Sequence, residues 1–286
     1  MLAQIPSAIQ KRIDEKLQCT LKQFSLSSGG CINNGGELNT STGSYFLKWN
    51  DAHRFPKMFE AEAKGLGLLS IAKAIRIPAV ILNDEIEKYQ FLLLEWIESK
   101  NRSRKFWENA GEQLAHLHYN SQNYFGLNHD NYVGSLLQRN KAEESWVTFF
   151  IQQRLLPQLE LLSPDQSLLS KFDVLFQKLP SLLPEEKPAL LHGDLWSGNL
   201  IPDESGAPCL IDPAVYYGNR EIEIAFTQLF GAFDSAFYDS YQNAFRLLPG
   251  FKDRVDLYNL YPLLVHANLF GGDYLNKVKT ILNRFI

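Results

Sequence analysis

Cysteine is scarce in this sequence, and long hydrophobic runs are absent. The three cysteines, Cys19, Cys31 and Cys209, have neither C-x-x-C nor any other metal-ligand spacing, which excludes a zinc site and a disulfide scaffold and is typical of a reducing compartment. No run approaches the ~20 apolar residues that a membrane-spanning helix needs, and the N-terminal residues lack the apolar core of a signal peptide. We therefore expect a cytoplasmic protein that does not contact a membrane.

An excess of positive charge is also missing. Lys and Arg number 28 against 32 Asp and Glu, which leaves a net charge of -4 and no basic block that could follow a nucleic-acid backbone. Nucleic acid is therefore not an expected partner. The 286 residues are 45% hydrophobic and 13% aromatic, which is enough for one large or two modest hydrophobic cores.

The first part of the chain has the patterns of β-strands around one helix. We predict strands over residues 20–28 and 45–49, joined across a glycine-rich loop at residues 29–36. Residues 55–71 have apolar positions at helical spacing, and Pro56 is suited to the first turn of that helix. These elements predict a small lobe built on a glycine-rich hairpin.

A change of pattern divides the chain near residues 97–102. Before it, apolar runs at 79–82 and 89–96 flank a polar stretch and predict another hairpin, whereas helical spacing dominates after it. The helical segments are residues 104–118, 144–162, 166–179 and much of 221–286. The predicted fold class is α+β and bilobal, with an N-terminal lobe (1–97) of antiparallel sheet plus helix and a larger, mainly helical C-terminal lobe (98–286).

One stretch of the second lobe carries recognisable chemistry. Asp194, within His192-Gly193-Asp194, follows an apolar strand on a short loop, where a carboxylate can accept the proton of an attacking hydroxyl. Asn199 and Asp212 follow it and offer the oxygen ligands that Mg²⁺ prefers. Phosphoryl transfer needs mainly positioning and charge neutralisation, so we predict Asp194 as the catalytic base and Asn199 and Asp212 as metal ligands.

The spacing of the two metal ligands predicts how they meet. Asn199 and Asp212 are equidistant from the middle of the 205–206 peptide. If strands at 200–202 and 209–211 pair without a bulge, the two ligands come side by side at the mouth of a hairpin.

Each of these residues alone is a weak signal, because an Asp or Asn beside glycine is usually a turn residue. The ordered set is much stronger: a strand, H-G-D-x-x-x-x-N, a short hairpin and an Asp form the catalytic arrangement of kinases, with Gly193 where protein kinases place arginine. No A-P-E follows Asp212, which argues against a protein Ser/Thr kinase. We therefore predict an ATP-dependent kinase of small molecules.

The first lobe supplies the remaining parts of a nucleotide site in the expected order. Lys48 follows the glycine-rich loop, where its ammonium can reach phosphate oxygens; Glu62 on the next helix is its preferred partner, with Glu60 as the alternative. The loop does not match G-x-G-x-x-G, so only its position before Lys48 predicts that it closes over the phosphates of the nucleotide. At the lobe junction, backbone groups would contact adenine. The predicted nucleotide-binding residues are Lys48, Glu62, Gly29, Gly30, Cys31, Ile32, Asn33, Glu95, Trp96 and Ile97.

Five segments of the chain carry a further signal: SGGCIN (28–33), YFLKWN (45–50), MFEAEAKGL (58–66), LLHGDLWSGN (190–199) and IDPAVYYGNREIEIA (211–225). Together they resemble the fructosamine kinase family, also called ketosamine-3-kinases, within the aminoglycoside/choline-type branch of the protein-kinase-like fold. The resemblance spans nearly the whole chain. It implies transfer of the γ-phosphoryl of ATP, with Mg²⁺, to the 3-hydroxyl of a ketosamine, a small-molecule or protein-bound glycation adduct that phosphorylation makes unstable.

Two residues depart from the family's G-D-R-E-x-D pattern, since Asn219 and Glu223 stand where Asp is usual. Both retain an oxygen ligand, so the departures put substrate choice in question more than catalysis. A related phosphotransferase that acts on an aminoglycoside, choline or another amino-alcohol is the alternative. A non-catalytic, nucleotide-binding pseudokinase is disfavoured, because the whole catalytic set is present.

Several aromatic and histidine side chains have a structural role as the alternative to a functional one. Trp196 and Tyr217 are predicted to contact the sugar or amine, with core packing as the alternative. His116 and His118 point to different helix faces and are expected to pack or lie on the surface. His192 is expected to shape the catalytic loop rather than act as a base.

Cys31 lies in the loop expected to close over the phosphates. Its plainer role is to fill space, but a thiol near a lysine and a bound cation is also a setting for site-selective oxidation. The resemblance adds that a loop cysteine can form a disulfide between subunits, which allows a homodimer. We predict that peroxide lowers activity, that dithiothreitol restores it, and that Cys31→Ala removes this response.

Overall fold

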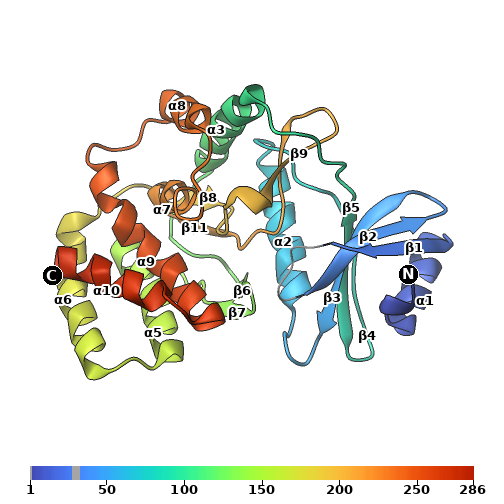
Figure 1. The fold of residues 1–286 in the computed structure, drawn as a ribbon, viewed down its shortest axis with the longest axis horizontal. Helices are drawn as coiled ribbons and strands as arrows, with labels where there is room; N and C mark the ends of the chain where they lie inside the picture. Colours follow the sequence, from blue (N-terminus) through green and yellow to red (C-terminus); the bar gives the residue numbers. More distant parts are fainter. Residues whose placement is uncertain (1, 28–32) are drawn as a thin grey trace.

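The computed structural model describes residues 2–27 and 33–286 and has two lobes (Figure 1). The smaller lobe contains the N-terminal strands, drawn in blue and cyan, and the larger lobe contains most of the helices, drawn in green to red. This arrangement confirms the predicted bilobal α+β fold. Within the described residues, no helix is long and apolar enough to cross a membrane.

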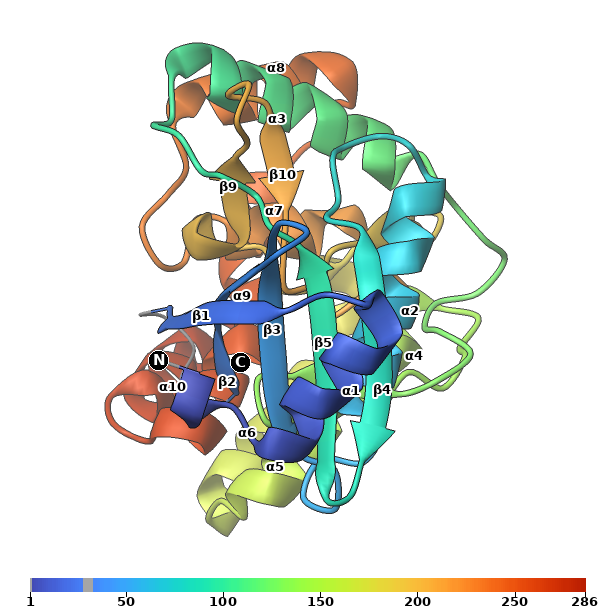
Figure 2. The same ribbon diagram turned by 90° about the vertical axis from the view of Figure 1, so that its right-hand side faces the viewer.

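A five-stranded antiparallel sheet of order β1-β2-β3-β5-β4 forms the smaller lobe. Its strands are β1 (Leu21–Leu26), β2 (Asn34–Thr40), β3 (Ser44–Asp51), β4 (Val80–Ile86) and β5 (Tyr89–Glu95). Helix α1 (Ser7–Leu17) covers one face (Figure 2), and α2 (Met58–Ile71) packs against the other. Alternation along β5 explains both contacts, since Phe91 joins the α1 core and Leu92 joins the α2 core.

Strand β2 differs from the prediction, which assigned residues 29–36 to a loop. Gly36 lies within β2, and a Cβ there would lie 2.1 Å from the backbone oxygen of Ser25 on β1. Only glycine permits this close approach, yet its low strand propensity conceals the strand in the sequence. Four predicted loop residues lie outside the described residues: Gly29, Gly30, Cys31 and Ile32.

Helix α2 begins later than predicted. Lys57 has a left-handed backbone with φ of 59°, so the helix starts at Met58 and Pro56 lies in the preceding turn. The other predicted helices correspond to helices in the structure, and the 144–162 segment contains a π-helical turn at Phe150–Leu155.

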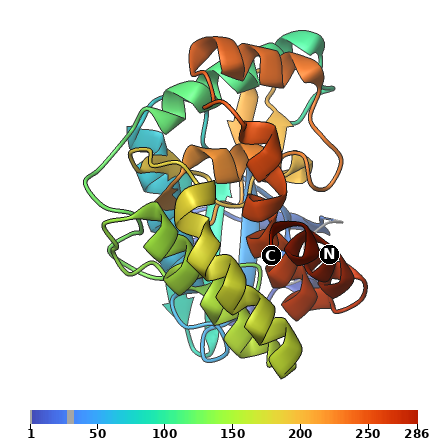
Figure 3. The same ribbon diagram turned by 90° about the vertical axis from the view of Figure 1, so that its left-hand side faces the viewer.

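The larger lobe packs helices around short β-hairpins. Its helices are α3 (Arg104–His118), α4 (Trp146–Phe149), α5 (Leu156–Leu162), α6 (Gln166–Leu182), α7 (Arg220–Phe226), α8 (Ser235–Ala244), α9 (Phe251–Phe270) and α10 (Tyr274–Phe285). Its strands are β6 (Asn131–Val133), β7 (Leu136–Gln138), β8 (Ala189–Leu191), β9 (Leu200–Pro202), β10 (Pro208–Leu210) and β11 (Tyr216–Gly218). Helices α5, α6, α9 and α10 form the outer wall of this lobe (Figure 3), which leaves β8 to β11 facing the smaller lobe.

Candidate active site

Asp194 lies on the loop after β8, and the two residues before it, His192 and Gly193, hold this loop in place. Gly193 has φ of 85°, and a Cβ there would lie 2.0 Å from the Ala214 carbonyl oxygen. His192 is fully buried; its Nε2 donates to Ile211 O at 2.8 Å, and its Nδ1 accepts from Asp194 N–H at 3.3 Å. Burial lowers the pKa of His192, so a neutral imidazole shapes the loop, as predicted.

A buried carboxylate from α7 holds the same loop. Glu223, 3% exposed, accepts the backbone N–H of Gly193 at 2.7 Å and that of His192 at 3.2 Å. In the sequence, Glu223 stands out only as a departure from the Asp that is usual there. Its role depends on a contact between residues thirty positions apart, which spacing along the chain cannot reveal.

Asp194 and Asn199 lie in direct contact. Asn199 Nδ2 donates to the backbone oxygen of Asp194 at 2.8 Å and to its Oδ2 at 3.2 Å. Burial, together with repulsion from Asp212 and Glu223, raises the pKa of Asp194 to about 7, although the Asn199 hydrogen bond opposes the shift. A carboxyl with this pKa can exchange a proton near neutral pH, as a general base must.

Lys48 bridges the two lobes. Its Nζ lies 2.6 Å from Glu62 Oε1 and 2.5 Å from Asp212 Oδ1. Burial alone would lower the pKa of Lys48, but the two carboxylates outweigh it and hold the pKa above its ordinary value. The predicted pairing with Glu62 is therefore present, whereas Glu60 pairs with Lys64 at 2.6 Å.

The hairpin that joins Asn199 to Asp212 has a different register from the one predicted. Strands β9 and β10 pair Leu200 with Leu210, and Ile211 N–H donates to Asn199 O at 3.0 Å. Asp212 therefore lies one residue beyond the partner of Asn199, and the expected symmetry about the 205–206 peptide is wrong.

The turn explains this register. Asp203 and Ala207 close a three-residue loop whose last residue, Gly206, has φ of 85°, the geometry of a type I turn followed by a bulge. Asp203 Oδ1 accepts the N–H groups of Ser205 and Ala207 and fixes this loop. Asp212 itself has φ of 55°, a strained backbone that is typical of functional sites.

Two predicted nucleotide contacts are already engaged within the protein. Asn33 Oδ1 accepts from Asn50 Nδ2 at 2.9 Å, which holds the start of β2 to β3. The backbone N–H of Glu95 donates to Ala79 O at 2.9 Å, and its carboxylate pairs with Arg76 at 2.7 Å. Glu95 therefore cannot offer its N–H to adenine, although its carbonyl still lies at the junction between the lobes.

The next two junction residues pack in different ways. Trp96 stacks on Phe46 of β3, with ring centroids 6.3 Å apart, and Ile97 is 7% exposed. The stacking of Trp96 on Phe46 holds the segment against the smaller lobe at the end of β5.

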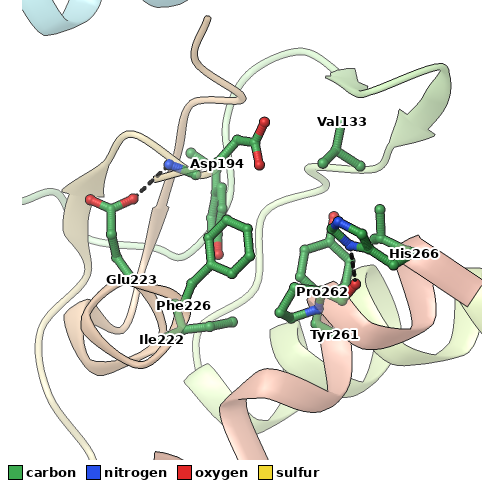
Figure 4. Close-up of a pocket in the computed structure, with 11 residues that line it drawn as sticks. Val133, Asp194, Ile222, Glu223, Phe226, Tyr261, Pro262 and His266 are labelled. Carbon is green, nitrogen blue, oxygen red and sulfur yellow. Dashed lines mark hydrogen bonds between the residues drawn. The ribbon is translucent and has the colours of Figure 1, made fainter. Parts of the chain in front are cut away.

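A narrow pocket lies against Asp194 (Figure 4). Apolar and aromatic residues form most of its wall: Val133, Tyr216, Ile222, Phe226, Tyr261, Pro262 and Val265. Glu223 of α7 and His266 of α9 also line the pocket. The Nδ1 of His266 lies 2.8 Å from Pro262 O, and burial lowers the pKa of this histidine. The ring is thus neutral at pH 7, with Nδ1–H donating to the carbonyl and Nε2 left as an acceptor.

Comparisons with known proteins agree with this geometry. The family model for fructosamine kinase matches residues 1–286. A protein named probable ketoamine kinase from Vibrio parahaemolyticus is 40% identical over 267 residues, which cover 91% of each chain. The chloroplastic protein-ribulosamine 3-kinase of Oryza sativa subsp. indica is 36% identical over 266 residues, or 90% of this chain and 77% of that protein. The chain belongs to the fructosamine kinase family.

A solved structure extends the agreement to the fold. The crystal structure of a fructosamine-3-kinase candidate from Haemophilus somnus 129PT has a TM-score of 0.88 and 27% identity, and the match covers 98% of this chain and 97% of that one. The protein is thus a phosphotransferase of the kinase-like fold. These relatives do not favour the aminoglycoside or choline alternative.

The departure at Asn219 has a structural role in this fructosamine kinase. Its side chain is fully buried and caps α7, with Oδ1 accepting from Glu221 N–H at 2.9 Å. An Asp would cap the helix equally, so the change from Asp to Asn keeps the hydrogen bond and removes a buried charge.

The two predicted substrate aromatics lie outside the pocket wall. Tyr217 packs with the core between α3 and α8, while its neighbour Tyr216 lines the pocket, because successive side chains of β11 point to opposite faces. Trp196 is 41% exposed on the loop after Asp194. Tyr261 and His266 were not predicted from the sequence, because they stand in the apolar stretch 260–267 of α9, whose pattern indicates core packing rather than a site.

Proposed function

We propose that this fructosamine kinase transfers the γ-phosphoryl of ATP to the 3-hydroxyl of a ketosamine. The observation that carries the proposal is a carboxyl, Asp194, whose pKa is about 7 and which lies between a mostly apolar pocket and the Lys48–Asp212 pair. The names of the Vibrio and rice relatives, a ketoamine kinase and a protein-ribulosamine 3-kinase, support the acceptor class.

The nucleotide would lie between the lobes, with residues 1–97 as the nucleotide-binding unit and 98–286 as the catalytic unit. Lys48 would bind phosphate oxygens, and Glu62 would keep its ammonium in place once Asp212 turns to another partner. The junction segment 95–97 would receive adenine, through the carbonyl of Glu95 and the backbone of the residues that follow.

The residues present fit a magnesium ion that arrives with the nucleotide. No group of three or more His, Cys, Asp or Glu side chains that could hold a metal exists within the described residues. Asn199 uses its amide N–H₂ on Asp194, which leaves Oδ1 as an oxygen ligand, and Asp212 adds a carboxylate. Mg²⁺ commonly takes one or two protein ligands plus phosphate oxygens, and it would neutralise charge on the transferring phosphoryl group.

The reaction needs one proton transfer. Asp194 accepts the proton of the 3-hydroxyl while that oxygen forms a bond to the γ-phosphorus, and the bond to the β–γ bridging oxygen breaks to release ADP. Asn199, bonded to Asp194 at two points, fixes the carboxylate, and Lys48 offsets charge on the phosphates.

The pocket beside Asp194 would take the sugar. Its apolar walls exclude water from the reacting oxygen, and Nε2 of His266 is an acceptor for a hydroxyl or an ammonium group. The amine side would extend toward the exposed Trp196, and Tyr217 would support the loop from the core side. This orientation leaves room for an adduct on either a free amine or a protein lysine.

A coupled assay of ADP release tests the proposal with matched acceptors: fructosamine, ribulosamine and erythrulosamine adducts of free lysine and of a protein, an aminoglycoside, and choline. We expect turnover on ketosamines, with ³¹P–¹H correlation NMR placing the phosphate on the 3-oxygen. Asp194→Asn serves as the catalytically dead control. Turnover confined to the aminoglycoside or choline would contradict the proposed acceptor.

A further inference from the structure

A buried histidine outside the pocket contacts the carboxylate that holds the catalytic loop. His118, the last residue of α3, is 2% exposed, and its Nε2 lies 2.9 Å from Oε2 of Glu223. The same Oε2 accepts the backbone N–H of His192, and Oε1 accepts that of Gly193. No Lys or Arg pairs with Glu223 among the described residues, so three hydrogen bonds stabilise this buried charge.

The pKa of Glu223 agrees with an ionised carboxylate. Burial by itself would raise this pKa, but the hydrogen bond from His118 and the backbone N–H of Gly193 outweigh it, and the pKa lies below its ordinary value. An ionised Glu223 can only accept hydrogen bonds. Each of its three partners must therefore donate.

The neighbours of His118 determine which ring nitrogen carries the proton. Nδ1 lies 2.7 Å from the hydroxyl oxygen of Tyr241, and Arg220 Nη1 donates to that same oxygen at 3.3 Å. With Arg220 as donor, the Tyr241 hydroxyl is free to donate its proton to Nδ1. Hydrogen on Nε2 of His118 then directs a donor at Glu223, while Nδ1 accepts from Tyr241.

Packing of α3 against α8 holds this geometry (Figure 1). A Cβ at Gly111 of α3 would lie 2.2 Å from the carbonyl oxygen of Phe237 on α8, so the two helices approach at backbone distance. This contact places Tyr241 of α8 against His118 of α3, with both side chains buried.

We propose that His118 is a positioning residue for phosphoryl transfer: it orients Glu223 so that both carboxylate oxygens hold the loop that presents Asp194. This role of His118 rests on the proposed function only in that the proposed phosphoryl transfer is the reaction whose rate is measured. His118 does not line the pocket itself and reaches its wall only through Glu223, and it contacts neither Lys48 nor the partners of Lys48, so its loss should act on the catalytic loop and not on nucleotide binding.

The test compares two replacements of His118 with a control on the same helix. His118→Leu removes the donor, and His118→Gln retains an N–H near the position of Nε2; His116→Leu alters an exposed histidine. We expect kcat to fall about tenfold or more in the leucine variant. Without the hydrogen bond from His118, the buried carboxylate of Glu223 loses a partner, and the loop that presents Asp194 is misplaced in the transition state. The dissociation constant of Mg·ATP should change less than about twofold, and glutamine should restore most of kcat.

Three results would overturn the role of His118: unchanged kcat in His118→Leu, an equal loss of kcat and of Mg·ATP affinity, or equal kcat in the glutamine and leucine variants. If the leucine variant does not fold, His118→Asn takes its place, since its shorter amide can reach Tyr241 but not Glu223. The ratio to wild type is measured with any acceptor that the wild type phosphorylates, or by basal ATP hydrolysis. Lack of wild-type turnover on ketosamines therefore counts against the proposed function alone.

Discussion

Replacing Asp194 by asparagine should abolish catalysis and at the same time stabilise the metal-free protein at alkaline pH. Burial and the nearby Asp212 raise the pKa of Asp194 from 3.8 to about 7. Since each pKa unit corresponds to about 1.36 kcal/mol, keeping this carboxylate ionised lowers the free energy of unfolding by up to about 4 kcal/mol at pH 8. Its side chain retains some contact with solvent on the pocket wall, so we expect about 2–4 kcal/mol.

The sign of the effect follows from proton binding. A carboxyl with a raised pKa binds more protons in the folded than in the unfolded state, so stability is highest below about pH 4 and falls as the pH rises toward 7. Asparagine does not titrate, and its Oδ1 can still accept from Asn199. The stabilisation by Asp194→Asn should therefore grow between about pH 5 and pH 8 and then level off.

Urea unfolding with EDTA and without nucleotide measures this difference at the two pH values. Asp203→Asn is the matched control: Asp203 is 4% exposed, and its hydrogen bonds to Ser205 and Arg76 overcome the effect of burial and hold its pKa below the ordinary value. Its replacement should destabilise the protein equally at pH 8 and pH 5, because both values lie above the ordinary pKa of an Asp, and the loss should shrink only below about pH 4. Assayed separately with Mg²⁺ and ATP and without EDTA, Asp194→Asn should lower kcat by about 10²-fold or more.

Two results would refute the reasoning about Asp194. One is a variant no more stable than wild type at pH 8, and the other is a gain of equal size at both pH values. Either would mean that the carboxyl is solvated in the folded protein, so that its pKa could not lie near 7. Near-normal kcat on the best ketosamine would show that Asp194 is not the base.

Three further predictions concern the rest of the site. Glu62→Gln should lower kcat/KM for ATP by about tenfold, because it weakens the hold on the buried lysine, whereas Glu60→Gln, whose partner is exposed, should not; equal effects in steady-state kinetics would contradict the assigned pairing. Gly193→Ala should destabilise the protein far more than Gly206→Ala. Both glycines have φ of 85°, but only a Cβ at Gly193 would meet backbone, at 2.0 Å. Thermal unfolding should show a loss of about 1–2 kcal/mol for Gly206→Ala, and a similar loss for Gly193→Ala would argue against the loop geometry. Calorimetry should detect tight Mg²⁺ binding only with a non-hydrolysable ATP analogue, because the described residues offer no cluster of three metal-ligating side chains; tight binding of the ion alone would contradict this.

The local sequence determined the parts of the site that depend on short segments. The strand, the H-G-D loop and the hairpin leading to Asp212 lie within about two dozen residues, and each has its own turn or strand pattern. The order of Lys48 and Glu62 also follows from one strand and the helix after it. Hydrophobic periodicity likewise separates the strand-rich lobe from the helical lobe, because period 2 and period 3.6 are properties of consecutive residues.

Only the tertiary structure decided the features that depend on contacts between distant segments. The contact of Lys48 with Asp212 joins residues 164 positions apart, and Glu223 meets the loop from a helix thirty positions away. Strand β2 could not be predicted from the sequence, because its Gly36 is required by the close approach of β1 and glycine has a low strand propensity. The register of the β9–β10 hairpin shifted by one residue because side-chain hydrogen bonds of Asp203 select a three-residue turn. In each case the free energy comes from partners that a linear pattern does not bring together, so the residue type constrains what is possible and packing determines which contact forms.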